Sequence, residues 1–294
     1  MQWLFYATLC TILFTIYNIL NKLVVKDSSP DYIAHLTMII YSLLNLPLIF
    51  VFKEHLTLNI KSFIGLILAG LLFAIAGIYY MRSLSLGRLS DTIPLLSFTP
   101  IITLFVAYFV VKELPGLLGI TGIILMIAGA YLLHIKEMSK HHLLRPLTSL
   151  FKFKASRYML LVTFLYGFGA TIDKYVIINS NIMTRILLIS YFTLIFQAPY
   201  LIFKDRQGYC FKLKEVFKYR FWQVFGITII FLAMIAAQMV AITKTYVAYV
   251  TALKRTAALF TVVAAYIFFG EKDNFKQTLL GTMFLVIGAV LLVV

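Results

Sequence analysis

The sequence predicts an all-α integral membrane protein of ten transmembrane helices, arranged as two inverted five-helix repeats. The first observation is composition, because 62% of the 294 residues are hydrophobic and only 13% are charged. That charged fraction is about half of what a soluble domain carries. The second is a series of apolar stretches of roughly twenty residues, the length that crosses the hydrocarbon core of a bilayer. The third is that the two halves of the chain carry similar sequences, and an odd number of spans per half turns one copy upside down relative to the other.

The ten expected spans follow one another with few long connections. In the first half they cover residues 3–25, 32–52, 62–86, 91–111 and 114–135, and in the second half 158–178, 184–203, 221–242, 247–269 and 275–294. Short loops make successive helices antiparallel neighbours, and the longer connections are 136–157 and 204–220. We therefore divide the chain into a first repeat (1–135), a basic connecting loop (136–157) and a second repeat (158–294).

The internal repeat is visible in three pairs of segments. LFTIYNILNK (13–22) aligns without gaps with LYGFGATIDK (165–174), which places Asn21 opposite Asp173. GIILMIAGAYLL (122–133) aligns with GTMFLVIGAVLL (281–292). The stretches 89–113 and 247–271 have the same length, the same apolar character and the same closing glutamate, Glu113 in one and Glu271 in the other.

Basic residues predict the orientation in the membrane. The formal net charge is +15, and 18 Lys and Arg residues lie in loops after odd-numbered spans against 5 in loops after even-numbered spans. Because basic loops stay in the cytoplasm, we expect both termini on the non-cytoplasmic side of a plasma membrane, or of the inner membrane in a bacterium. Basic clusters beside spans also predict contact with anionic membrane lipids, so nucleic acid is not an expected partner.

At the paired stretches 89–113 and 247–271 the chain resembles the drug/metabolite transporter superfamily, specifically its EamA-type permeases. The segment 83–133 is similar to the family repeat almost from end to end, with Pro100 thirteen residues before Glu113, while Ala258 replaces this proline in the second half. The resemblance implies ten helices around a central cavity, working by alternating access. It also implies substrates ranging from amino acids and sugars to phosphorylated metabolites and choline-like cations. Familiar members are usually drawn with both termini in the cytoplasm, whereas the loop charges here point the other way.

Two adjacent cations inside the ninth span indicate a binding site. Lys254 and Arg255 interrupt an apolar stretch, where each basic residue costs about 2.5–3.5 kcal/mol at the bilayer centre. By helix rise, Arg255 lies roughly 12 Å from the even-loop side, close to the depth of Asp173 and Gln238. Lys174 falls near the same layer, so positive charge is left over even where Asp173 pairs with Arg255 or Lys254. We expect this layer to bind an anionic group, because the planar guanidinium can hold two oxygens at once.

The alternative is that these charges are structural. Asp173 would then form an internal ion pair that locks the sixth and ninth spans, with Lys254 extending toward the headgroups. Adjacent helix positions are about 100° apart, so Lys254 and Arg255 cannot both point at one centre. Arg255 shares a face with Thr251 and is the stronger candidate for the cavity. In the first half, Asn18 is a further cavity candidate.

Three tyrosines share faces with these polar positions, so we add them to the substrate-binding candidates; they are Tyr17, Tyr80 and Tyr166. The sequence contains no P-loop, no Ser/His/Asp set and no His-Glu-x-x-His motif, so we expect neither an enzyme nor a cofactor. His35 and His134 stand alone, and the two cysteines, Cys10 and Cys210, are far apart, so we expect no metal site.

These observations predict a secondary transporter, monomeric or homodimeric, that moves a small organic metabolite. The expected substrates are an amino acid, a carboxylate or a phosphorylated solute. Two alternatives stay open. One is a flippase for a lipid-linked phosphate headgroup, which a lateral opening between helices would favour. The other is a non-transporting membrane subunit, whose polar layers would be dry and paired among themselves.

Overall fold

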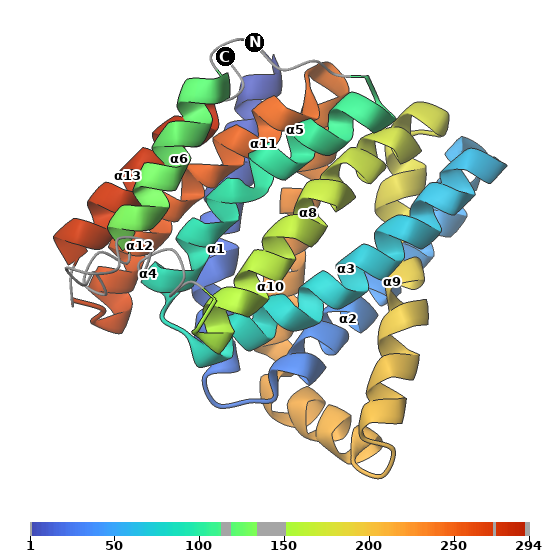
Figure 1. Ribbon diagram of the computed structural model, residues 1–294. Coiled ribbons are helices and arrows are strands. Elements are labelled where there is room, and N and C mark those ends of the chain that lie inside the picture. Colours follow the sequence, from blue (N-terminus) through green and yellow to red (C-terminus); the bar gives the residue numbers. More distant parts are fainter. Residues whose placement is uncertain (1, 113–118, 134–150, 273–274, 292–294) are drawn as a thin grey trace.

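The computed structural model describes residues 2–112, 119–133, 151–272 and 275–291, and all regular secondary structure in these ranges is helical (Figure 1). Glu113, His134 and residues 136–150 lie outside the described part.

Eight helical segments are long and apolar enough to cross a membrane, which makes the chain a multi-pass membrane protein. They are α1 (Gln2–Val25), α2 (Pro30–Val51), α3 (Ile60–Leu86), the interrupted segment Leu89–Val110, α8 (Lys154–Asn179), α9 (Ile182–Lys204), α10 (Tyr209–Lys244) and the interrupted segment Val247–Phe269. Two shorter apolar helices are α6 (Gly119–Leu133) and α13 (Phe275–Leu291), and a 3₁₀ turn, η1 (Lys53–His55), follows α2.

The two spans expected at 91–111 and 247–269 are present as segments of membrane length, and each is interrupted along its course. The first consists of α4 (Leu89–Thr92), the 3₁₀ turn η2 (Ile93–Phe98) and α5 (Thr99–Val110). Pro94 and Pro100 lack the N–H that an α-helix needs. The second consists of α11 (Val247–Arg255) and α12 (Ala257–Phe269). At the break, the Thr256 hydroxyl donates to the Leu253 carbonyl oxygen at 2.7 Å, which competes with the regular helix ladder.

Helix α10 corrects one expectation. Residues 204–220 were expected to form a loop, but α10 runs without interruption from Tyr209 to Lys244, a length of 36 residues. At 1.5 Å per residue it measures about 54 Å, well beyond the roughly 30 Å of a hydrocarbon core. Its first turns, which carry the exposed Lys212 and Lys214, therefore extend outside the membrane.

The connecting segments after α1, α3, α9 and α12 meet on one face of the bundle, which we call the odd-loop face. The Glu271 carboxylate accepts the backbone N–H groups of Leu89 and Ser90 at 2.9 Å each. The Lys22 ammonium donates to the carbonyl oxygen of Gly87 at 2.7 Å. Glu271 thus stabilises the start of α4, because a carboxylate satisfies free N–H groups at a helix N-terminus.

The segments after α2, α8 and α10 are joined on the opposite face. Asn59 donates to the carbonyl oxygen of Asn179 at 2.6 Å, and Asn181 donates to that of His55 at 2.6 Å. Lys174 donates to the carbonyl oxygen of Thr245 at 3.0 Å. Connecting segments are therefore sorted to two faces, as the alternating spans predict.

Helices α6 and α13 lie side by side (Figure 1), and glycines lie where their backbones approach each other. A methyl group added at Gly129 would lie 2.6 Å from the carbonyl oxygen of Gly281. One added at Gly288 would lie 2.5 Å from the carbonyl oxygen of Gly122. The contacts are reciprocal, because Gly122 aligns with Gly281 and Gly129 with Gly288 in the repeat. The two backbones thus touch directly, as small residues allow between membrane helices.

Candidate functional site

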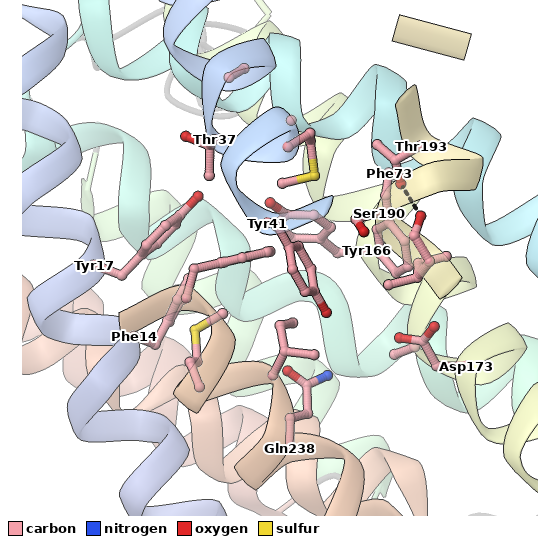
Figure 2. Close-up of a pocket in the computed structure, with 18 of the residues that line it drawn as sticks. Phe14, Tyr17, Thr37, Tyr41, Phe73, Tyr166, Asp173, Ser190, Thr193 and Gln238 are labelled. Carbon is pink, nitrogen blue, oxygen red and sulfur yellow. Dashed lines mark hydrogen bonds between the residues drawn. The ribbon is translucent and has the colours of Figure 1, made fainter. Parts of the chain in front are cut away.

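A cavity of about 100 Å³ lies within the bundle, between residues of α1, α2, α3, α8, α9, α10 and α11. Both repeats contribute to its wall. Figure 2 shows Asp173 and Gln238 toward one end of the cavity and Thr37 and Thr193 toward the other. The charged residues among its described lining are Asp173, Arg185, Lys254 and Arg255.

Aromatic rings form much of the wall, and they belong to Phe14, Tyr17, Tyr41, Phe73, Tyr166 and Phe231. The Tyr17 and Phe231 ring centroids are 5.3 Å apart, and the Tyr41 ring meets the Phe231 ring edge-on at 5.8 Å. Tyr17, Tyr41 and Tyr166 enter the space from different helices in Figure 2. The wall can therefore pack against an apolar or flat group, which aromatic rings contact favourably.

The carboxylate of Asp173 is paired with Arg185, and not with Arg255 or Lys254. The Arg185 Nε donates to Asp173 Oδ1 at 2.8 Å, and its Nη2 donates to Oδ2 at 2.6 Å. Each side chain is only 3% exposed. The loop charge count had included Arg185 among the even-numbered loops, although it is the second residue of the span expected at 184–203. The structure begins α9 two residues earlier than predicted, at Ile182, and the Asn181 side chain caps it, so Arg185 sits in a buried first turn. A capping residue at 181 was the signal that could have placed it there.

Lys254 has neutral partners. Its Nζ donates to the Gln238 Oε1 at 2.7 Å and lies 4.5 Å from the centre of the Phe14 ring. The side chain is buried against these two residues, so the alternative that it extends toward the headgroups is wrong. An amide oxygen and an aromatic face stabilise an ammonium, but neither neutralises it.

Arg255 is the least satisfied group in the cavity wall. It is 4% exposed, and its Nε and Nη1 atoms have no hydrogen-bond partner within the described residues. Its guanidinium carbon lies 5.8 Å from the centre of the Phe14 ring. Arg255 ends α11, and the carbonyl end of a helix favours a cation there. A buried donor without an acceptor still costs about 1–3 kcal/mol, and more when it is charged. An oxyanion in the cavity would remove that cost.

Seven of the nine sequence-predicted site residues line the cavity: Tyr17, Tyr166, Asp173, Gln238, Thr251, Lys254 and Arg255. Asn18 and Tyr80 do not, and their expected place in the wall is corrected. The Tyr80 hydroxyl donates to Asn18 Oδ1 at 2.6 Å, and the Asn18 amide donates to the Thr261 hydroxyl at 3.3 Å. The Tyr80 ring stacks on the Tyr17 ring, with centroids 5.9 Å apart. Asn18 and Tyr80 therefore pack behind the residues that line the cavity. Lys174, which donates to the Thr245 carbonyl oxygen, is also absent from the cavity lining.

Several polar residues of α2 and α9 in the cavity wall were not predicted from the sequence. Thr37 and Tyr41 on α2, and Thr193 and Gln197 on α9, all line the cavity. Each pair is spaced by four residues within an apolar span, which puts its members on one helix face. That spacing of four residues was the available signal. It does not stand out, because single hydroxyl and amide groups are common in membrane helices.

Comparisons with known proteins agree with this architecture. A sequence model described as the EamA-like transporter family matches residues 1–135 and 154–294. A solved structure titled only "Crystal structure of protein" superposes with a TM-score of 0.65 at 10% sequence identity, covering 99% of this chain and 96% of that one. At that identity the likeness concerns the fold alone. No curated protein matches the chain.

Proposed function

We propose, since the chain belongs to the EamA-like transporter family, that it is a secondary transporter that moves a small organic anion by alternating access. The expected cargo is an amino acid, a carboxylate or a phosphorylated solute. Membership of the family makes the chain a membrane permease, and the choice of an anion comes from the cavity.

The observation that carries the proposal is the unpartnered guanidinium of Arg255 in the cavity wall. Asp173 is already bound to Arg185 by two hydrogen bonds, so it forms no ion pair with Lys254 or Arg255. Two buried cations beside one space favour a ligand that brings negative charge, because an uncompensated buried charge is strongly destabilising. The arrangement also speaks against a non-transporting subunit, whose polar groups would be paired among themselves.

The rest of the cavity suggests the shape of the cargo. Aromatic rings of Tyr17, Tyr41 and Tyr166 face the space, and a volume of about 100 Å³ suits a small molecule. We infer a cargo with one anionic group near Arg255 and a compact apolar or flat body against the rings. Pockets of this composition bind by apolar contact and orient by a few polar groups.

We extend the proposal to the topology. Counting α6 and α13 as spans gives ten crossings, and the reciprocal glycine contacts between these helices support an inverted repeat. The loop charges support a cytoplasmic odd-loop face and non-cytoplasmic termini. The location would be the plasma membrane, or the inner membrane in a bacterium.

The test is thermal unfolding of the purified protein with inorganic phosphate, phosphoenolpyruvate, benzoate or choline as probes. A ligand at a hundred times its dissociation constant stabilises the folded state by about 2.7 kcal/mol, which shifts the unfolding temperature measurably. We expect the anions to stabilise the wild type and to have no effect on Arg255→Gln. Arg206→Gln, a change at an exposed arginine of the α9–α10 turn, is the matched control and should respond like the wild type.

Arg255→Lys separates charge from shape. It keeps the positive charge but loses the fork that binds two oxygens, so we expect roughly tenfold weaker anion binding than in the wild type. Stabilisation by choline alone would overturn the anion proposal. Stabilisation only by phosphate groups that carry an acyl chain would favour the flippase alternative.

A further inference from the structure

His35 is a buried ionisable side chain next to the cavity that the proposed anion site does not use. It lies on α2, is 1% exposed, and both ring nitrogens have a partner. Its Nδ1 is 3.4 Å from Gln197 Oε1, and its Nε2 is 2.9 Å from the Tyr209 hydroxyl. Gln197 lines the cavity, whereas Tyr209 begins α10 at the odd-loop face and is partly exposed. The imidazole thus connects the cavity wall with the protein surface.

The hydrogen bonds assign the neutral tautomer. The Gln197 Nε2 donates to the carbonyl oxygen of Ala74 at 3.3 Å, so its oxygen is the atom that faces His35. An amide oxygen only accepts, so His35 Nδ1 carries the proton of the neutral ring. Nε2 is then the acceptor, and the Tyr209 hydroxyl donates to it.

The same contacts also satisfy the charged ring. A second proton at Nε2 turns this nitrogen into a donor, and the Tyr209 hydroxyl oxygen can accept from it. The proton can arrive in one relay step. The Tyr209 O–H bond breaks as its proton joins Nε2, and the phenol oxygen takes a replacement proton from water at the odd-loop face. No hydrogen bond is lost in either state, so the site holds His35 neutral or charged.

We propose that His35 binds the proton that is co-transported with the anion, an inference that rests on the proposed function. A proton on His35 adds positive charge beside a cavity where Arg255 and Lys254 already lack a carboxylate. A bound anion therefore raises the proton affinity of His35, and the proton raises the anion affinity by the same factor. Anion and proton then move together and in the same direction.

The charged groups around His35 are compensated locally. Asp31, one turn before His35 on α2, is bound by Arg82 of α3 at 2.6 Å and by Lys204 of α9. Asp205, beside the start of α10, is bound by Lys212. Other titratable side chains at this end of α2, α3, α9 and α10 include Tyr32, Tyr79, Tyr80, Tyr200, Cys210, Lys214, Glu215 and Arg220. Because Asp31 and Asp205 have cationic partners and Glu215 is exposed to solvent, the cavity charge is the variable to which His35 responds.

The experiment follows the His35 ring directly. Protein with ¹³C-labelled histidine rings is placed in lipid nanodiscs and titrated from about pH 5 to 9 by NMR, and His35→Gln identifies the His35 signal. We expect this ring to take up a proton as the pH falls. Saturating phosphoenolpyruvate should raise the midpoint by about one pH unit, a tenfold coupling. His55→Gln removes an exposed histidine at the opposite face and should leave the His35 titration unchanged.

A second variant tests the relay. Tyr209→Phe removes the group that accepts from the charged ring, so the His35 midpoint should fall. A ring that stays neutral throughout, or a midpoint that does not move when the anion is bound, overturns the proposal. A titrating ring in a protein that binds no anion at any pH overturns the proposed function and leaves the proton site standing.

Discussion

Asp173 and Arg185 hold each other by two hydrogen bonds across the turn between α8 and α9, and both side chains are almost fully buried. The pair occupies the end of the cavity toward the even-numbered loops. Asp173 carries the one carboxylate in the described lining. Because Arg185 binds it, it does not compete with an anionic ligand for the other cations of the wall. Lys254 and Arg255 thus form no ion pair within the described lining.

This pairing predicts strong coupling between the two residues. Asp173→Asn leaves a buried guanidinium without its counter-ion, so we expect a loss of about 3–5 kcal/mol in stability. Arg185→Gln should cost a similar amount, and the double variant should cost clearly less than the sum. Thermal unfolding of all four proteins measures the coupling. Additive losses would mean that the ion pair does not form.

Glu271 predicts a stabilising contact between the two repeats. Its carboxylate accepts two backbone N–H groups at the start of α4, and bonds to a charged group contribute about 1.5–3 kcal/mol each. Glu271→Ala should lower the unfolding temperature by several degrees. Glu215→Ala, at an exposed position on α10, serves as the control and should change it little. Equal effects of the two substitutions would contradict the capping role.

The crossing of α6 and α13 predicts a steric effect at Gly129. An alanine there brings a methyl group within 2.6 Å of the Gly281 carbonyl oxygen, so the helices must separate. We expect Gly129→Ala to reduce stability by about 1–3 kcal/mol, as for other overpacked contacts. Gly226→Ala is the matched control, because a methyl group at that helical glycine meets no atom within 4 Å. This control should be neutral or slightly stabilising, since alanine favours helix more than glycine does.

Native cysteines allow a test of orientation. Cys210 is exposed near the start of α10, at the odd-loop face, whereas Cys10 is fully buried. A membrane-impermeant maleimide should therefore label the wild type only from the cytoplasmic side, and Cys210→Ser should abolish labelling. Labelling from the opposite side alone would place both termini in the cytoplasm.

Much of the helical framework could be predicted from the sequence, because apolar stretches of membrane length are a strong signal. The errors lie where helices depart from uniform spans. Pro94 and Pro100 mark the break at η2 in the sequence, whereas the break at Thr256 depends on a local hydrogen bond that apolar composition does not reveal. The extended start of α10 was missed because its lysines resemble those of a basic loop, although they lie on a helix that leaves the membrane.

The candidate site was predictable to a similar degree. A charge inside an apolar span is visible in sequence, which is how Lys254, Arg255 and Asp173 were found. The sequence did not show which cation pairs with Asp173. Arg185 lies near the end of a span, and only the capped start of α9 turns its side chain inward. Asn18 and Tyr80 share faces with cavity residues, but hydrogen bonding to each other turns them away from the space.

The glycine contacts between α6 and α13 also restrict how the protein can move. Sliding one helix along the other by a residue would bring side chains into positions that only hydrogen atoms now occupy, so the pair cannot shift in register. Any motion that opens the cavity to one side and then to the other must leave these two helices fixed against each other. Under the proposed alternating access, α6 and α13 would therefore move as one rigid unit.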